Sequence, residues 1–417
     1  MRLDEFVEGF ERDEAAERRR LAEEKSYEIT NYLDDVEQQF EETVQGDSLF
    51  GSTAPEIFVG RSNYPSVSTG LLSPMADGAD AADYATSGDW YQQGFDIDDV
   101  LQRRTGLLNS TRSSQVNVKD VWDGFVGVQR EVAIADRPVD VELGLDTAPE
   151  LDLSLDDIST PTGPRARATD ADLAENPHVP RPVEKTLEDD DWQAEGAMNY
   201  LYRRGFDVYD INTILSAGAL GQGHNRRLVP TRWSITAVDD TVGQYLRGTI
   251  RNEQTVNEVQ VWYNEYVGND YWVILAPGNW EFELVELKAP GSIWNPEPDG
   301  AYYMAADNEG YEGRTAYVDE TSGAYYASRL AVLEHLEDVG RQATCLVIRH
   351  ASESYWAPVG VWQIREGIRH AFEGEYATAE TFHDAVTQLA PALPVSLTDL
   401  RRKSTMVAGI QSQLGDF

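Results

Sequence analysis

The chain has 417 residues, of which 73 are Asp or Glu and 34 are Lys or Arg, so its formal net charge at pH 7 is −39. This length predicts roughly two or three domains. The 41% hydrophobic and 10% aromatic residues predict that the chain is folded, because disordered chains are poor in aromatics. The single cysteine, Cys345, excludes an internal disulfide and a Cys-based zinc site. No stretch has the length and apolarity of a membrane span, and the N-terminus lacks the apolar core of a secretory signal, which predicts a cytoplasmic protein.

The acidity is accompanied by very little lysine, since only five of the 34 basic residues are Lys. Acidic surfaces repel themselves, and molar salt relieves this because the Debye length falls to about 3 Å. We therefore expect a halophilic, archaeal protein. The same net charge argues against nucleic-acid binding by bulk electrostatics alone.

The predicted elements begin with a charged, proline-free helix over residues 1–46. A Gly/Ser/Pro-rich stretch over about 46–88 predicts a long ordered loop or a set of turns. Residues 115–158 alternate apolar with polar side chains, which predicts antiparallel strands. The alternating residues are Val126, Val128, Val132, Ile134, Val139, Val141, Leu143, Leu145, Leu151, Leu153 and Leu155. Five prolines make 159–190 a predicted connector, and 190–218 predicts one or two helices.

In the second half, strands are predicted over 226–237, 259–266, 271–275 and 280–288, with a short helix through Tyr245. Predicted helices then cover 324–339, 360–372, 378–389 and 396–410, and a strand covers 343–349. Ser396 is the predicted N-cap of the last helix. The sequence thus predicts the α+β class, with an N-terminal helix, a strand-rich central region (47–295), a mixed helical C-terminal region (296–405) and a tail (406–417).

The tail places Gln411, Leu414 and Phe417 three positions apart, ending on the final residue. In a 3₁₀ turn these side chains project from one side as one amide and two apolar groups. The pattern resembles the PIP box, by which replication and repair proteins dock on the sliding clamp PCNA. A PIP box usually ends in two aromatics, whereas this tail has Phe417 alone. The alternative is a frayed C-terminus that matches by accident.

Asp270 opens one predicted strand, and Glu286 and Lys288 close the next. An acid followed by Glu-x-Lys at a strand end is the pattern of PD-(D/E)xK nucleases, in which hard oxygen ligands hold Mg²⁺. The alternative is a solvated charge pair on a strand face. Without the nuclease function we expect no metal or cofactor.

Three arginines, Arg226, Arg227 and Arg232, cluster beside a predicted strand, and Arg61 lies in the predicted loop. Guanidinium groups match phosphate geometry, so these four residues are candidates for contact with nucleic acid. The alternative is internal pairing with the surplus carboxylates.

Five segments carry a wider resemblance: FVGRSNYP (58–65), RLVPTRWSITAVDD (227–240), WEFELVE (280–286), YYASRLAVLE (325–334) and YWAPVGVW (355–362). They resemble the Nre family of archaeal DNA repair proteins over residues 15–405, and the family resemblance includes the PIP-like tail. It implies an N-terminal and a C-terminal Nre region, and a role in repairing damaged DNA with PCNA as partner. It implies no agreed catalytic mechanism, and without a Cys before 345 a zinc-finger-like N-terminus is not expected. The favoured prediction is a repair factor recruited to the clamp by its tail, with DNA or other repair proteins as further partners; the alternative is a Mg²⁺-dependent nuclease acting on damaged or branched DNA.

Overall fold

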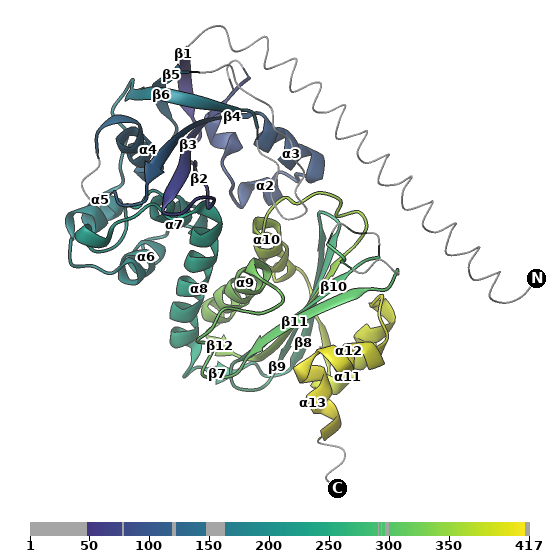
Figure 1. The fold of residues 1–417 in the computed structure, drawn as a ribbon. Helices are drawn as coiled ribbons and strands as arrows, with labels where there is room; N and C mark the ends of the chain where they lie inside the picture. Colours follow the sequence, from purple (N-terminus) through teal and green to yellow (C-terminus); the bar gives the residue numbers. More distant parts are fainter. Residues whose placement is uncertain are drawn as a thin grey trace, which may run out of the picture.

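The computed structural model describes residues 48–76, 79–118, 122–146, 163–290, 292, 294–296 and 300–412. Two six-stranded mixed sheets and their helices make up these residues, which confirms the α+β class (Figure 1). The predicted helix over 1–46, the run Leu151, Leu153 and Leu155, and the tail residues Leu414 and Phe417 lie outside the described residues.

The first sheet, sheet I, is built by the N-terminal strands in the order β1-β5-β6-β4-β3-β2. Its strands are β1 (Ser48–Thr53), β2 (Ile57–Val59), β3 (Ser66–Pro74), β4 (Leu107–Gln115), β5 (Val139–Leu145) and β6 (Arg165–Leu173). One face is covered by α4 (Gly124–Ile134), whose Phe125, Val128 and Val132 pack against Leu71 and Leu143. The short elements η1 (Ala81–Tyr84), α2 (Asp89–Gln92) and α3 (Ile97–Thr105) connect β3 to β4.

The second sheet, sheet II, has the order β11-β10-β13-β9-β8-β14. Its strands are β8 (Val259–Tyr266), β9 (Asn269–Ala276), β10 (Glu281–Lys288), β11 (Tyr303–Glu309), β13 (Thr344–Ala351) and β14 (Ala377–Ala379). Only β10 and β13 run parallel among these neighbours. The boundary predicted at residues 295 and 296 falls between β10 and β11, which pair in this sheet. A separate two-stranded ribbon joins β7 (Gln254–Thr255) to β12 (Arg341–Gln342).

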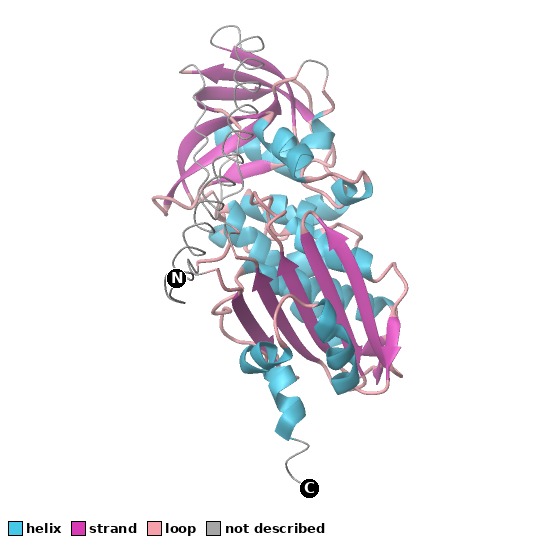
Figure 2. Cartoon of the chain, turned by 90° about the vertical axis from the view of Figure 1, so that its right-hand side faces the viewer, coloured by secondary structure: helices cyan, strands magenta, loops and turns pink. Residues whose placement is uncertain are grey.

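Helices cover both faces of sheet II (Figure 2). One face packs against α8 (Thr231–Ile250), α9 (Gly323–Asp338) and α10 (Trp362–Ala371). The other packs against α11 (Phe382–Leu389), η3 (Ala390–Ala392), α12 (Leu397–Lys403) and α13 (Thr405–Ser412). Between the sheets in sequence lie α5 (Arg181–Glu188), α6 (Ala194–Tyr202), α7 (Val208–Ser216) and η2 (Gly223–Asn225). None of the helices in the described part of the chain is long and apolar enough to cross a membrane.

Buried aromatics join the early helices to the C-terminal region. Trp90 of α2 meets Trp362 of α10 edge-on, with ring centroids 5.3 Å apart. Phe95, Val100 and Tyr355 belong to the same buried cluster. This packing fixes the loop before α10 against α2 and α3.

Four predictions of secondary structure were wrong. The predicted loop over 46–88 contains β1, β2, β3 and η1, and the predicted connector contains β6 and α5. The predicted strands at 126–134 form α4, and residues 231–237 begin α8 rather than a strand. In both helices the deciding signal is four-residue spacing: Val128 and Val132 are buried in α4, and Val238 and Val242 in α8.

The remaining predictions in the described residues agree closely with the structure. Helices fill most of 190–218, 324–339 and 360–372, and strands occupy 259–266, 271–275, 280–288 and 343–349 within one or two residues. Ser396 caps α12, because its Oγ accepts a hydrogen bond from Asp399 N at 3.1 Å. The predicted helix over 396–410 is interrupted at Ser404, and 378 lies in β14, so α11 begins only at Phe382.

Candidate functional site

The three residues of the predicted nuclease site lie on opposite faces of sheet II. Asp270 pairs in register with His350, whereas Glu286 pairs with Arg349 and Lys288 with Ala351. Directly paired residues point to the same face and successive residues to opposite faces. The Asp270 side chain therefore shares a face with His350, and the Glu286 and Lys288 side chains point to the other.

Glu286 is already engaged in ion pairs. Its carboxylate lies 2.5 Å from Arg349 Nη1 and 3.5 Å from Lys288 Nζ, and it is almost fully buried. Arg349 also donates from Nε to Asn269 Oδ1 at 3.0 Å. A buried carboxylate with two cationic partners is a structural ion pair rather than an open metal ligand. Across the residues that the structure describes, no group of three or more His, Cys, Asp or Glu is placed to hold a metal ion.

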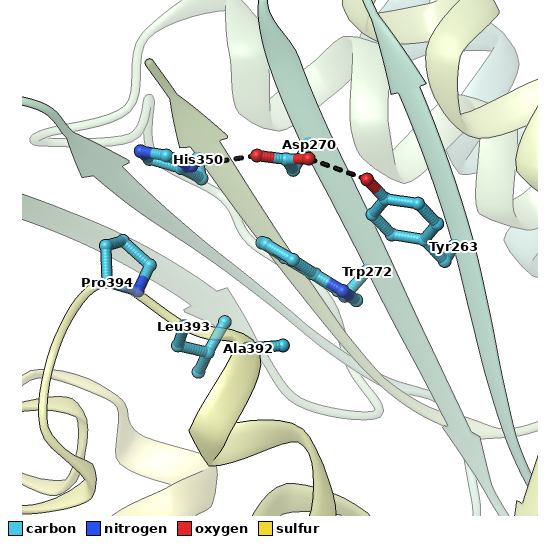
Figure 3. Close-up of a pocket in the computed structure, with 7 residues that line it drawn as sticks. All are labelled: Tyr263, Asp270, Trp272, His350, Ala392, Leu393 and Pro394. Carbon is cyan, nitrogen blue, oxygen red and sulfur yellow. Dashed lines mark hydrogen bonds and ion pairs between the residues drawn. The ribbon is translucent and has the colours of Figure 1, made fainter.

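Asp270 instead lines a pocket of about 500 Å³ on the face that carries the C-terminal helices (Figure 3). The strands β8, β9 and β13 supply its polar and aromatic wall, and the end of η3 with the two residues after it supplies the opposite, apolar wall. The lining residues are Tyr263, Asp270, Trp272, His350, Ala392, Leu393 and Pro394.

Hydrogen bonds fix the polar end of this pocket. Asp270 lies 2.8 Å from His350 Nδ1 and accepts from Tyr263 Oη at 2.7 Å (Figure 3). His350 Nε2 lies 3.4 Å from Tyr302 Oη. Burial and the bond to Asp270 raise the pKa of Tyr263, so its hydroxyl remains a donor. With polar groups at one end and Leu393 and Pro394 opposite, the pocket suits binding of a partly polar group.

Arg226 is a structural residue. Its side chain is 5% exposed and donates hydrogen bonds to the carbonyl oxygens of Gly221, Thr186 and Leu187 at 2.8–3.2 Å. It thereby ties the end of α5 to the turn after α7. The guanidinium faces inward, so phosphate contact by Arg226 has no support in the structure.

The other three candidate arginines lie on the surface. Arg61, Arg227 and Arg232 are all exposed. They come from two segments that meet, because Val59 N donates to Thr231 Oγ1 at 2.9 Å. The end of β2 lies beside the start of α8 in Figure 1.

Two aromatic residues beside these arginines were missed by sequence reasoning. Tyr64 and Trp233 are 45% and 46% exposed, and their ring centroids lie 5.4 Å apart. By contrast, the aromatics of the segment YWAPVGVW are covered: Tyr355 and Trp362 are buried and Trp356 is half-buried. Tyr64 and Trp233 lie in the motifs FVGRSNYP and RLVPTRWSITAVDD, so the available signal was their closeness to Arg61 and Arg232.

The base of the tail is firmly anchored. Glu283 of β10 is fully buried, and its carboxylate accepts hydrogen bonds from Ser404 Oγ, Thr405 N and Met406 N at 2.6–2.9 Å. These donors begin α13, whose last turn includes the backbone of Gln411. A carboxylate at a helix N-terminus satisfies its free N–H groups and complements the helix dipole. The tail thus starts from a fixed point on sheet II.

Two family models match the chain. The model described as Archaeal Nre, N-terminal, matches residues 21–295, and Archaeal Nre, C-terminal, matches residues 309–417. The chain belongs to the archaeal Nre family. It is 70% identical over 420 residues to the protein named DNA repair protein NreA of Haloferax volcanii, and the match covers 100% of both chains.

Two Nre proteins of Archaeoglobus fulgidus are also similar. The one named DNA repair protein NreA is 39% identical over 81% of this chain and 84% of its own length. The one named DNA repair protein NreB is 35% identical over 88% of this chain and 92% of its own. No solved structure matches the chain.

In this Nre protein, two of the segments that carry the family resemblance meet in space. The segment at 58–65 contains Arg61 and Tyr64, and the segment at 227–240 contains Arg227, Arg232 and Trp233. The Val59–Thr231 hydrogen bond and the Tyr64–Trp233 ring contact join them. The family motifs therefore build one surface, which neither motif forms alone.

Proposed function

We propose that the protein is a cytoplasmic DNA repair factor that docks on the PCNA sliding clamp through Gln411, Leu414 and Phe417. The observation that carries the proposal is the three-residue spacing of Gln411, Leu414 and Phe417 in an Nre chain. The relatives named DNA repair proteins support the repair role.

The anchoring of α13 supports the docking role. Because Glu283 holds Ser404, Thr405 and Met406, the PIP-like residues follow directly on an element fixed to sheet II. Less chain has to be ordered when the clamp is bound, and this reduces the entropic cost of docking. The apolar Leu414 and Phe417 supply an anchor whose burial strengthens with salting-out ions.

The nuclease alternative has little support. Its three residues do not converge, because Asp270 and the pair Glu286/Lys288 face opposite sides of sheet II. Glu286 is buried against Arg349. A repair factor that only docks on the clamp requires no metal-binding nuclease residues.

The test is calorimetric titration of the full-length protein with the sliding clamp of the same organism in molar KCl. Leu414→Ala and Phe417→Ala should each weaken binding by about 10-fold or more, because truncating a buried interface anchor commonly costs over 1 kcal/mol. Ser412→Ala, which lies between the motif positions 411 and 414, is the matched control and should bind as the wild type does. Equal affinity of the wild type and both motif variants would remove the proposal.

A further inference from the structure

The three longest stretches of this acidic chain without any Asp or Glu are residues 211–238, 57–76 and 100–119. The structure brings parts of all three together. Val116 N donates to Pro65 O at 3.0 Å, and Leu228 N donates to Val116 O at 2.8 Å. The bond from Val59 N to Thr231 Oγ1 closes the same junction. In a molecule of net charge −39, three acid-free segments therefore meet in one place, which we call the acid-poor region.

Exposed aromatic rings mark this region. Tyr64 and Trp233 leave nearly half of their surface in water. Their rings lie 5.4 Å apart with an interplanar angle of 51°, so they form an open pair of π-faces rather than a closed stack. Exposed aromatic rings side by side are the usual platform for stacking a flat, apolar partner.

Exposed arginines lie on the same two segments as the aromatic pair. Arg232 precedes Trp233 at the start of α8, and Arg61 lies in the turn that leads to Tyr64. Arg227 is exposed on the adjoining segment. The first turn of α8 contains no acidic residue, so no side chain of that turn neutralises the positive end of the helix dipole. The combination of π-faces and guanidinium groups suits a ligand with flat rings and a negative backbone.

We propose that the stacking surface, formed by Arg61, Tyr64, Arg227, Arg232 and Trp233, binds single-stranded DNA. Bases stack on Tyr64 and Trp233, and the arginines contact phosphates. A duplex hides the faces of its bases, so a stacking platform selects single strands. The choice of DNA rests on the proposed function in repair. The stacking contribution survives high salt, whereas the release of counterions from phosphate contacts loses its effect there.

The experiment measures binding of a fluorescein-labelled oligothymidylate of about 20 nucleotides to the full-length protein in molar KCl without the clamp. Trp233→Ala and Tyr64→Ala should each weaken binding by about 10-fold, because each removes one stacking face. Tyr317→Ala is the matched control: Tyr317 is 56% exposed and pairs with Tyr326 at 5.3 Å, far from the acid-poor region in sequence. It should bind as the wild type does.

A second pair of variants tests the charges. Arg61→Glu should weaken binding and lower its dependence on salt concentration. Arg402→Glu makes the same change of charge on α12, where the Arg402 side chain is 77% exposed, and should have little effect. Thermal unfolding of each variant establishes that the fold is retained.

Three results would overturn the inference: unchanged oligothymidylate binding in Trp233→Ala and Tyr64→Ala, equal affinity for a duplex of the same length, or tighter binding of oligouridylate. Titration of the same variants with the clamp separates this inference from the proposed function. Loss of DNA binding with intact clamp binding supports a second, independent site. Clamp binding that survives deletion of 411–417 contradicts the proposed function and leaves the stacking surface untouched.

Discussion

His335 is packed as a neutral ring between elements of sheet II and its helices. It stacks on Phe372 with ring centroids 3.9 Å apart and meets Trp262 edge-on at 5.5 Å. Burial lowers the pKa of His335 from its ordinary value of 6.5 to about 4, and nearby Asp338 opposes the shift only in part. Between about pH 4 and pH 6.5, His335 is therefore mostly neutral in the folded protein and mostly protonated in the unfolded chain.

This shift predicts a loss of stability in acid. Between pH 6.5 and pH 4 the unfolded state binds more protons at His335 than the folded state, so stability falls as the pH falls. The contribution is up to about 1.4 kcal/mol per pH unit. Urea unfolding at pH 7 and pH 5, in the same KCl concentration, should show a larger loss for the wild type than for His335→Phe, which keeps the stack. The same pH dependence in both proteins would refute this role of His335.

The candidate site shows which residue properties the sequence can predict. The arginine cluster was found, but sequence alone could not tell that Arg226 turns inward to three carbonyl oxygens while Arg227, next to it, is exposed. That difference depends on the turn after α7. The sequence also could not predict the contact between Tyr64 and Trp233, because the two residues are far apart in the chain.

At the scale of elements, the junction between sheet II and α13 depends on one buried carboxylate. Glu283 accepts three hydrogen bonds from the start of α13, and burial raises its pKa while these bonds lower it in part. The Glu283→Gln amide keeps one acceptor oxygen but turns two donors toward the helix N–H groups. α13 should therefore open more easily.

The measurement is amide hydrogen exchange over residues 405–409. Glu283→Gln should lower the free energy of local opening by about 2 kcal/mol, as expected for a lost hydrogen-bonded charge. Glu281→Gln, an exposed residue of the same strand, is the matched control and should exchange as the wild type does. Unchanged protection in Glu283→Gln would show that apolar contacts alone hold α13 on the sheet.

The sequence predicts helices and strands well where the periodicity of apolar residues agrees with the positions of turn-forming Gly and Pro residues. The helix at 323–338 and the strands of 259–288 belong to this class, with Pro277 and Gly278 marking the turn between two of the strands. In α4, valines spaced by two residues imitate a strand because the helix is buried on most of its surface. The strands β1 to β3 were missed because their Gly and Ser content is typical of a loop, and their pairing with strands far away in the chain is not visible in the sequence.

At the scale of the whole molecule, the net charge of −39 sets the conditions under which the fold is stable. Raising KCl from about 0.1 to 2 M shortens the Debye length from about 10 Å to 2–3 Å, and this weakens repulsion among exposed carboxylates. We predict that the melting temperature rises steeply over this range. A melting temperature that stays the same from about 0.1 to 2 M KCl would mean that the acidity is not an adaptation to salt.

We propose that the tail contributes most of the recruitment to the clamp, and that the stacking surface adds contact to single-stranded DNA once the protein is bound there. A substitution in the tail should therefore lower survival after DNA damage more than a substitution on the stacking surface. Arg227→Ala is expected to cause a partial defect. Arg226→Ala is expected to act through stability, because it leaves three buried carbonyl groups without their donor.

Survival after DNA damage is the most direct test of clamp-dependent repair. It is measured in archaeal cells whose only copy of the protein carries Phe417→Ala, at protein levels matched to the wild type. We expect these cells to be as sensitive as cells lacking the protein, and Ser412→Ala cells to survive like the wild type. Full resistance of the Phe417→Ala cells would contradict it.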